Sequence, residues 1–332
     1  MSAPGLPFGD GIVVVTGGAG FIGSHVALDL AGLGVRVVVC DRLGTGDKWR
    51  NLAGAVIADL ILPETLLQWL DERTDAVAAI IHLGAISTTT EPDIDKLVAA
   101  NIRSSLDLWQ WCGGHRVPFV YASSAATYGD GAAGFSDLAT PEALARLQPL
   151  NAYGWTKHIV DRRIVDDVAR GRPIPPQWAG LKFFNVYGPH ETHKGPMQSV
   201  IGKIRPVVAA GEAVTLFRSH HPGYADGGQL RDFVYVEDCV AVIRWLLQNP
   251  EKSGLFNVGT GRARSFRDLV AAVGAALGRT PEIRFVDTPA ELRGRYQYFT
   301  CAEIGKLRAA GFAAAFHSLE DGVRDYFEHH AE

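Results

Sequence analysis

Short, continuous runs of apolar and β-branched residues recur through the first half of the chain. They cover residues 12–16, 35–41, 55–59, 76–85 and 117–124, and segments with helical spacing separate them. A run without polar alternation is typical of a strand that is buried on both faces of a parallel sheet. Strands that alternate with helices indicate right-handed β-α-β units and a doubly wound sheet.

The pattern becomes less regular in the second half. Residues 152–169 predict a long helix and residues 181–185 a further strand. Short strands are expected around a loop at 218–230 that is rich in Gly, Pro and Asp, which favours a surface excursion. These strands are expected at 214–217 and 231–239, and later helices at 237–248, 265–277 and 318–328.

We therefore predict an α/β protein with two parts. Residues 1–185 are expected to form a dinucleotide-binding domain of the Rossmann type, built on a doubly wound parallel sheet. Residues 186–332 are expected to form a smaller C-terminal α/β domain that binds substrate, although segments at about 230–260 return to the first domain.

Composition narrows the functional classes. The 332 residues carry a net charge of −4, which does not favour a nucleic-acid partner or an anionic membrane surface. The four cysteines lie far apart, without the spacing of a metal site, so we expect buried, reduced thiols and no metal. Neither a signal peptide nor a transmembrane segment is evident, which predicts a cytoplasmic protein with no membrane partner.

A glycine-rich turn follows the first strand. Gly17, Gly20 and Gly23 stand where a tight turn opens a helix, and a backbone of this kind can approach a pyrophosphate closely. Asp41 ends the next strand, 18 residues beyond Gly23, where an acidic residue binds an adenosine ribose. The turn, its helix and Asp41 together predict a dinucleotide site.

The choice between NAD and NADP depends on the residues around Asp41. Its carboxylate can accept a hydrogen bond from a ribose 2′-hydroxyl, which favours NAD. Arg42 and Lys48 can instead neutralise a 2′-phosphate, although Arg42 could also be an ordinary solvated loop residue. On balance the sequence favours NADP and leaves NAD open.

A second constellation indicates proton transfer. Ser123 and Ser124 stand at the carboxyl end of an expected strand, where open α/β sheets bind ligands. Tyr153 and Lys157 are four residues apart and share one helix face. A neighbouring ammonium lowers the pKa of a phenol, so Tyr153 can act as a base while a serine hydroxyl binds the reacting oxygen.

These motifs resemble the extended short-chain dehydrogenase/reductase family of nucleotide-sugar epimerases and dehydratases. The resemblance covers almost the whole chain and is carried by "TGGAGFIG", "YASSAATYG", "YGWTK" and "FFNVYGP". A more specific group is similar to one branch of that family, the isomerases that invert C6 of an ADP-linked heptose for lipopolysaccharide. This group comprises "STTTE", "HKG", "RDFVYVEDC", "FNVGTGRARSF" and "GRYQYFT".

The resemblance implies a reaction with two proton carriers. A hydride leaves the exocyclic C6 for tightly held NADP and returns to the opposite face of a transient ketone. Tyr153 serves one orientation and Lys194 the other, while Lys157 orients the ribose and tunes Tyr153. The alternative to a proton-transfer role is that Lys194 binds a phosphate or faces solvent.

Further residues carry over from the resemblance by position. Toward the cofactor these are Phe21, Ile22, Leu83, Gly84, Ala85, Ser87, Asn101 and Val186. Toward the nucleotide-sugar substrate they are Ser87, Ser124, Asn185, Lys194, Pro196, Lys203, Phe217, Arg231 and Tyr296. Arg231 and Tyr296 are expected to hold the diphosphate end. The resemblance also implies a homo-oligomer, which is a pentamer in that branch.

Three departures concern substrate recognition. Pro196 stands where a serine usually follows "HKG", Lys203 stands where a histidine is typical, and the 218–230 loop is longer than its counterpart. The leading alternative is therefore an epimerase that acts on a UDP- or GDP-hexose. Ala125 and Ala126 replace the acidic residues of a dehydratase, and a nucleotide-sensing protein without catalysis would commonly lack the tyrosine or the lysine.

Overall fold

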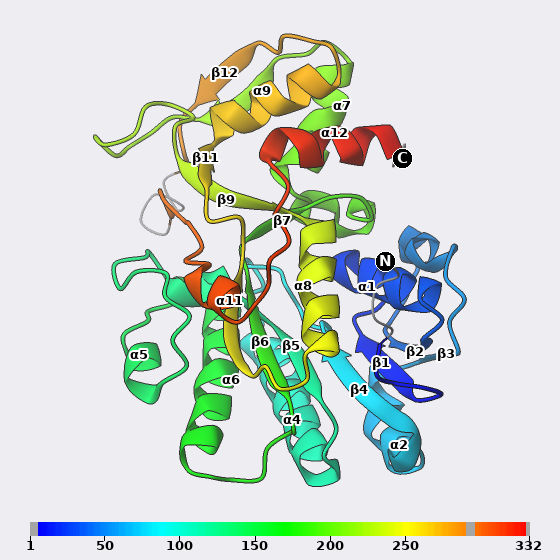
Figure 1. Cartoon of the computed structure of the whole chain (residues 1–332). Coiled ribbons are helices and arrows are strands. Elements are labelled where there is room, and N and C mark those ends of the chain that lie inside the picture. Colours follow the sequence, from blue (N-terminus) through cyan, green and yellow to red (C-terminus); the bar gives the residue numbers. More distant parts are fainter. Residues whose placement is uncertain (1–5, 290–295, 330–332) are drawn as a thin grey trace.

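Seven parallel strands form the main sheet of the computed structural model, which describes residues 6–289 and 296–329 (Figure 1). Their order across the sheet is β10-β6-β5-β4-β1-β2-β3, so the chain reverses its direction of winding between β1 and β4. Ligands bind at such a switch point, outside the carboxyl ends of the strands. The strands are β1 (Ile12–Thr16), β2 (Arg36–Cys40), β3 (Asp59–Ile61), β4 (Val77–His82), β5 (Phe119–Ser124), β6 (Trp178–Phe183) and β10 (Gly254–Val258).

The continuous apolar runs of these strands are explained by burial on both faces. Val13 and Val15 of β1 belong to one hydrophobic cluster, whereas Val14 belongs to the cluster on the other side. Successive side chains of a strand point to opposite faces, so both need apolar residues when helices cover both. The doubly wound α/β fold expected from the sequence is confirmed.

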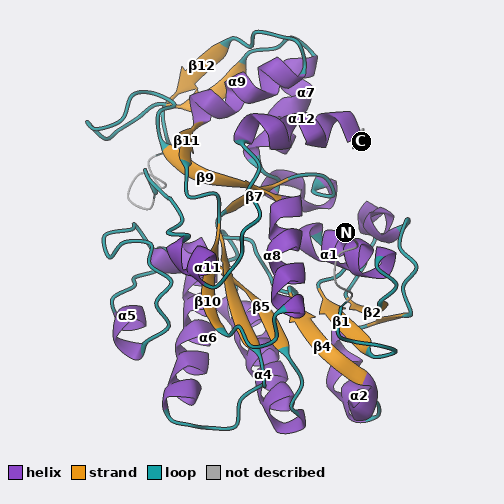
Figure 2. Cartoon of the chain, in the orientation of Figure 1, coloured by secondary structure: helices purple, strands orange, loops and turns teal. Residues whose placement is uncertain are grey.

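Helices cover the two faces of the sheet (Figure 2). One face packs against α1 (Phe21–Gly32), α8 (Val236–Gln248) and α11 (Gly305–Ala309). The other packs against α2 (Leu66–Asp71), α4 (Ser104–His115) and α6 (Ala152–Ala169). Shorter helices complete this part: η1 (Asp47–Leu52), α3 (Ile94–Leu97), the π-helical η4 (Val98–Arg103), η5 (Ala125–Tyr128) and α5 (Pro141–Ala145).

A smaller part lies above the carboxyl ends of the sheet (Figure 1). It has its own hydrophobic cluster, in which α7, α9 and α12 pack around two small sheets, β11-β9-β7 and β12-β8. Its elements are β7 (Asn185–Tyr187), η6 (Thr192–Met197), α7 (Val200–Ala209), β8 (Val214–Phe217), β9 (Leu230–Tyr235), β11 (Ala263–Ser265), α9 (Phe266–Ala276), β12 (Ile283–Val286) and α12 (Leu319–His329).

Three expected strands differ from the structure. The strand predicted at 55–59 is wrong, because β3 begins only at Asp59 and Val56 is exposed beside the sheet edge. The strand predicted at 181–185 begins earlier, at Trp178, and ends at Phe183, after which β7 joins another sheet. The strand predicted at 231–239 gives way to α8 at Val236.

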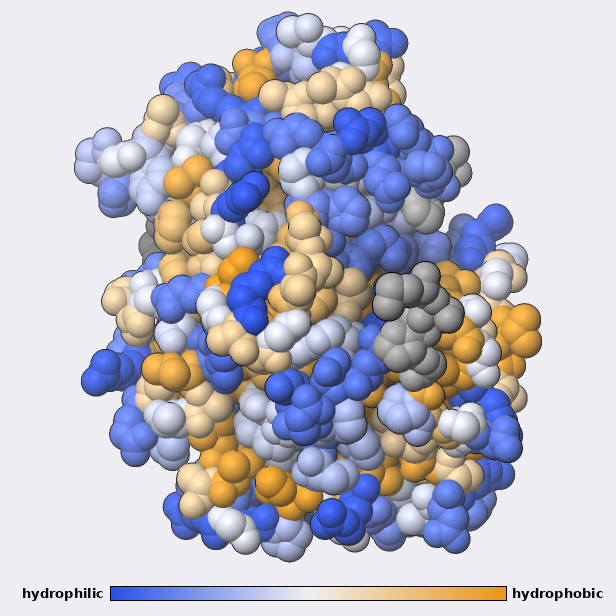
Figure 3. All heavy atoms as spheres, viewed as in Figure 1, coloured by the Kyte–Doolittle hydropathy of each residue, from blue (hydrophilic) through white to orange (hydrophobic). Residues whose placement is uncertain are grey.

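Three elements from beyond residue 230, α8, β10 and α11, are part of the larger layer structure: α8 contacts α1, β10 pairs with β6, and α11 packs on the same face of the sheet as α8. Within the described residues, no helix has the length and apolar character needed to cross a bilayer. On the face seen in Figure 3, hydrophilic residues are interspersed with smaller hydrophobic areas.

Candidate active site

The turn between β1 and α1 brings the backbone close to the end of β4. Gly17 has a φ of +66°, and a Cβ there would lie 2.6 Å from the amide nitrogen of Gly84. A Cβ on Gly23 would lie 2.1 Å from the carbonyl oxygen of Gly17. No side chain caps the first amides of α1, which begins at Phe21. These N–H groups and the positive helix end are therefore available to a pyrophosphate.

Asp41 follows β2 and is already surrounded by donors. Its carboxylate accepts hydrogen bonds from the backbone amides of Ala19 and Arg42, at 3.0 and 2.7 Å, and from Lys48 Nζ at 2.6 Å. The Arg42 side chain is 64% exposed and forms an ion pair with Glu64. Both cations that the sequence assigned to a 2′-phosphate are thus paired with carboxylates.

A cavity of about 520 Å³ lies at the carboxyl ends of the central strands. A second cavity, of about 710 Å³, adjoins it near Asp41 and Arg42. Eighteen of the residues singled out from the sequence line the first cavity: Gly17, Gly20, Phe21, Ile22, Gly23, Asp41, Lys48, Leu83, Gly84, Ala85, Ser87, Ser123, Ser124, Tyr153, Lys157, Asn185, Val186 and Lys194. The fold therefore brings together most of the predicted cofactor and catalytic residues.

Ser124, Tyr153 and Lys157 come from two adjacent elements. Ser124 ends β5, and its hydroxyl accepts a hydrogen bond from the amide of Ala126, which fixes the turn that follows. Asn151 caps α6 through the amide of Gly154, so Tyr153 lies in the first turn of that helix. Lys157 follows one turn later and is only 2% exposed.

The pKa values of this group differ in part from the expectation. Burial lowers the pKa of Lys157 to about 8, against the opposing charge of Asp161. Burial raises the pKa of Tyr153, and the Ser124 hydroxyl offsets this only in part. We expected Lys157 to lower the pKa of Tyr153, and this expectation is wrong for the protein alone because desolvation of the phenolate dominates.

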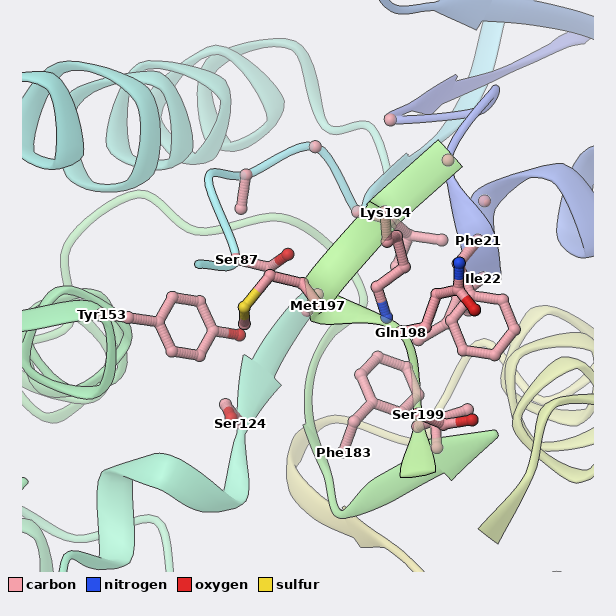
Figure 4. Close-up of a pocket in the computed structure, with 18 of the residues that line it drawn as sticks. Phe21, Ile22, Ser87, Ser124, Tyr153, Phe183, Lys194, Met197, Gln198 and Ser199 are labelled. Carbon is pink, nitrogen blue, oxygen red and sulfur yellow. The ribbon is translucent and has the colours of Figure 1, made fainter. Parts of the chain in front are cut away.

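Lys194 reaches the cavity from the loop between β7 and α7. Its Nζ lies 3.3 Å from Glu191 Oε2 and 4.9 Å from the centre of the Phe21 ring, and its side chain is 23% exposed. Figure 4 shows Tyr153 and Lys194 pointing into the same space from opposite sides, with Ser124 near Tyr153. The arrangement can place a proton carrier on each side of one bound group.

Sequence reasoning missed several residues that line this cavity. Those from the loop after Lys194 are Met197, Gln198, Ser199 and Val200, and those from strand ends are Ala122, Phe183 and Phe184. His193, the histidine of "HKG", also lines it. The "HKG" motif signalled this loop, but only the fold shows that the residues beyond it turn back toward the cavity.

Asn101 does not line either cavity, contrary to its assignment to the cofactor. Its side chain is fully buried, bonds both backbone groups of Ile86 at 2.8 and 3.0 Å, and donates to Thr156 Oγ1 at 3.1 Å. It joins the segment after β4 to helix α6. Asn101 therefore acts from behind the cavity wall, where an amide satisfies otherwise unpaired backbone groups.

Five residues assigned to the substrate lie outside the first cavity's lining. Pro196 and Lys203 are exposed. The other three, Phe217, Arg231 and Tyr296, cluster in the smaller part of the molecule. The centre of the Tyr296 ring lies 6.3 Å from that of the Phe217 ring and 5.4 Å from the Arg231 guanidinium carbon. The Arg231 guanidinium donates to the carbonyl oxygens of Leu230 and Gln297. Part of its hydrogen-bonding capacity is thus used to hold the backbone.

The chain is similar to known epimerases. The family model described as "NAD dependent epimerase/dehydratase family" matches residues 13–259. An ADP-L-glycero-D-manno-heptose-6-epimerase from Nitratidesulfovibrio vulgaris (Hildenborough) is 49% identical over 94% of this chain and 96% of its own.

Two solved structures of epimerases have folds similar to that of this chain. The crystal structure of the Helicobacter pylori ADP-L-glycero-D-manno-heptose-6-epimerase has a TM-score of 0.78 at 27% identity, over 96% of both chains. A Thermus thermophilus UDP-glucose 4-epimerase in complex with NAD has a TM-score of 0.73 at 27% identity, over 96% of this chain and 98% of its own. The chain therefore belongs to the NAD dependent epimerase/dehydratase family, in which it is an isomerase.

Proposed function

We propose that this enzyme interconverts ADP-D-glycero-D-manno-heptose and ADP-L-glycero-D-manno-heptose by inversion at C6, through a transient ketone and with NADP. The supporting observation is that Tyr153 and Lys194 point into one cavity from opposite sides, beside the glycine-rich turn. Inversion by oxidation and reduction on opposite faces is helped by a proton carrier on each side. The curated relatives supply the choice of sugar nucleotide.

The residues present fit a nicotinamide dinucleotide. Any Cβ at Gly17 or Gly23 would meet backbone, so glycine at both points keeps the turn tight, and the uncapped amides of α1 are available to a pyrophosphate. A bound nicotinamide supplies a reversible hydride acceptor. The amides of α1 would hold the pyrophosphate, Asp41 and Lys48 would hold the adenosine ribose, and Lys157 would hold the ribose next to the reacting centre.

The chain's own residues handle the protons. Tyr153 accepts the proton of the C6 hydroxyl while the C6 hydride leaves, and the Ser124 hydroxyl donates a hydrogen bond to the oxygen that becomes a carbonyl. When the ketone is reduced on its other face, Lys194 gives a proton to the oxygen. Tyr153 then releases its proton and Lys194 takes one up, which resets both carriers. Lys157, with a pKa of about 8, is partly unprotonated near neutral pH and first takes the phenol proton of Tyr153, which leaves the tyrosinate that accepts the C6 hydroxyl proton.

We propose NADP over NAD because two cations flank Asp41. A 2′-phosphate would replace Glu64 as the partner of Arg42, whose exposed side chain is free to turn toward it. Because the hydride returns to its donor, the cofactor is expected to stay bound between turnovers. We place the reaction in the cytoplasm, in a homo-oligomer that supplies heptose for the inner core of lipopolysaccharide.

The direct test is to incubate purified enzyme with ADP-D-glycero-D-manno-heptose, without added cofactor, and to follow both C6 epimers by NMR. We expect an equilibrium mixture of the two epimers. If bound dinucleotide is confirmed and no conversion occurs, the proposed substrate is wrong. UDP- and GDP-hexoses are then tested in the same way, because the dinucleotide site would still support a nucleotide-sugar epimerase.

A further inference from the structure

Glu191 lies at the centre of the loop that carries Lys194, yet it does not line the first cavity. The side chain is 1% exposed, and its hydrogen-bond partners Gly188, Lys194 and Ser199 belong to the same loop. Oε1 accepts a hydrogen bond from the Gly188 amide at 3.3 Å, and Oε2 accepts one from the Ser199 amide at 2.7 Å. Lys194 Nζ donates to Oε2 at 3.3 Å. One buried carboxylate thus ties both ends of the loop to its lysine.

The backbone conformation of this loop needs contacts that hold it in place. His190 has a φ of +66°, which is uncommon and costly for a residue with a Cβ, and Gly195 has a φ of +50°. The His190 ring packs at 4.6 Å from that of His25, and Ser24 bonds its Nδ1 at 2.9 Å, so the outer side of the loop is fixed to α1. Glu191 fixes the inner side, from which Lys194 projects.

Electrostatics give the carboxylate a second effect. Lys194 lies against the ring of Phe21, the first residue of α1, and the N-terminus of a helix carries a partial positive charge. An ammonium at that place is repelled by the helix end unless a negative group offsets it. Glu191 supplies that group in a site where water screens little, so its charge acts strongly on Lys194.

We propose that Glu191 is a positioning residue for Lys194: its buried carboxylate holds the ammonium against the wall of the cavity opposite Tyr153. The inference rests on the proposed function, in which Lys194 is the second proton carrier. Glu191 touches neither the substrate nor the cofactor in this scheme. Its effect on the reaction passes through Lys194 alone.

The test is a double-mutant cycle of Glu191→Gln and Lys194→Met, followed by initial epimerisation rates. Gln keeps the shape and can accept from Ser199, but it offers Lys194 no charge. We expect Glu191→Gln to lower kcat at least about tenfold with KM changed less than about twofold, because only the reacting geometry is disturbed. In the Lys194→Met background the same change should cost less than about twofold.

Two further variants separate the possible outcomes. Glu191→Asp keeps the charge and should recover part of kcat; if Glu191→Gln does not fold, the cycle is run with Asp. Asp167→Asn removes another buried carboxylate that pairs with a cation, Arg172 at 2.6 Å, and should leave kcat unchanged. The positioning role is wrong if Glu191→Gln leaves kcat unchanged. It is also wrong if the kcat losses of Glu191→Gln and Lys194→Met multiply in the double variant. If Lys194→Met itself keeps normal turnover, the two-carrier part of the proposed function fails instead.

Discussion

Lys182 Nζ lies 2.6 Å from Asp161 Oδ2, and both side chains are completely buried beneath the strand end that carries the site serines. Asp161 also accepts hydrogen bonds from the hydroxyls of Tyr121 and Ser123, at 2.9 and 2.7 Å. Lys182 donates to Thr127 Oγ1 at 2.7 Å. The ion pair thus joins β5, β6, α6 and the turn after Ser124 in one network.

Removal of one partner of this pair should be severely destabilising. Lys182→Met leaves the Asp161 charge buried without a cation, and we expect the free energy of unfolding in urea to fall by about 3–5 kcal/mol. Lys182→Met/Asp161→Asn should recover part of that loss, because no charge remains. Arg170→Met, at an exposed pair with Asp166, should cost about 1 kcal/mol or less. Equal losses for Lys182→Met and Arg170→Met would refute the argument.

Gly23→Ala should prevent cofactor binding. Its Cβ would lie 2.1 Å from the Gly17 carbonyl oxygen, so the turn must open and the amides of α1 lose their alignment. We expect the purified variant to contain no dinucleotide, measured by absorbance after denaturation, and to have a lower Tm. Gly32→Ala is the matched control in the same helix, because its Cβ would meet nothing within 4 Å. A Gly23→Ala protein with a full complement of cofactor would contradict this interpretation.

The two proton carriers should each be indispensable. Tyr153→Phe and Lys194→Met each remove a proton carrier from one side of the cavity, and we expect epimerisation to slow by at least about 10²-fold in either variant. Cofactor content, measured in the same preparations, should stay near that of the wild type. Lys252→Met, a lysine paired with Glu251, controls for loss of an ammonium elsewhere. Near-normal turnover of Lys194→Met would refute the two-carrier mechanism.

Cofactor choice should depend on Arg42. In Arg42→Ala the 2′-phosphate loses a bidentate partner, and the fraction of NADP among the extracted dinucleotides should fall at least about tenfold relative to NAD. Arg50→Ala, an exposed arginine that pairs with Asp47 at 3.1 Å, should leave the ratio unchanged. The ratio is measured by chromatography of the nucleotides released from each protein. An unchanged ratio in Arg42→Ala would remove Arg42 from the cofactor site.

Acid should destabilise the protein through His82. Burial lowers the pKa of His82 to about 3, and its ring bonds Thr16 at 2.7 Å and Ser105 at 2.9 Å. Below pH 6.5 the unfolded chain binds a proton at this histidine and the native protein does not. Stability is therefore complete above pH 6.5 and falls between 6.5 and about 3, at up to about 1.4 kcal/mol per pH unit.

The measurement for His82 is the pH dependence of urea unfolding. His82→Gln should flatten the acid slope, because the group that binds the extra proton in the unfolded chain is gone. His220→Gln, at an exposed histidine, should keep the wild-type slope. If His82→Gln unfolds with the same slope as the wild type, the acid sensitivity has another source.

Local patterns in the sequence determined elements that border the first cavity. The run "IVVVT" predicted β1 with the same bounds as the structure, and the helix predicted at 152–169 coincides with α6. Both depend on periodicity and on nearby residues alone. Gly17 and Gly23 were likewise found from their place between a strand and a helix, because the turn needs glycine at those points.

Only the tertiary structure decided what lies behind and opposite those residues. No role for Glu191, Asp161 or Lys182 follows from the sequence, because their partners are recognisable only after the chain has folded. Asn101 was also expected against the cofactor, and Lys157 was expected to lower the pKa of Tyr153, whereas packing buries the amide and desolvates the phenol. Residue type and spacing fix local conformation and chemical capacity. Burial, charge neighbours and the meeting of distant segments depend on how the layers pack.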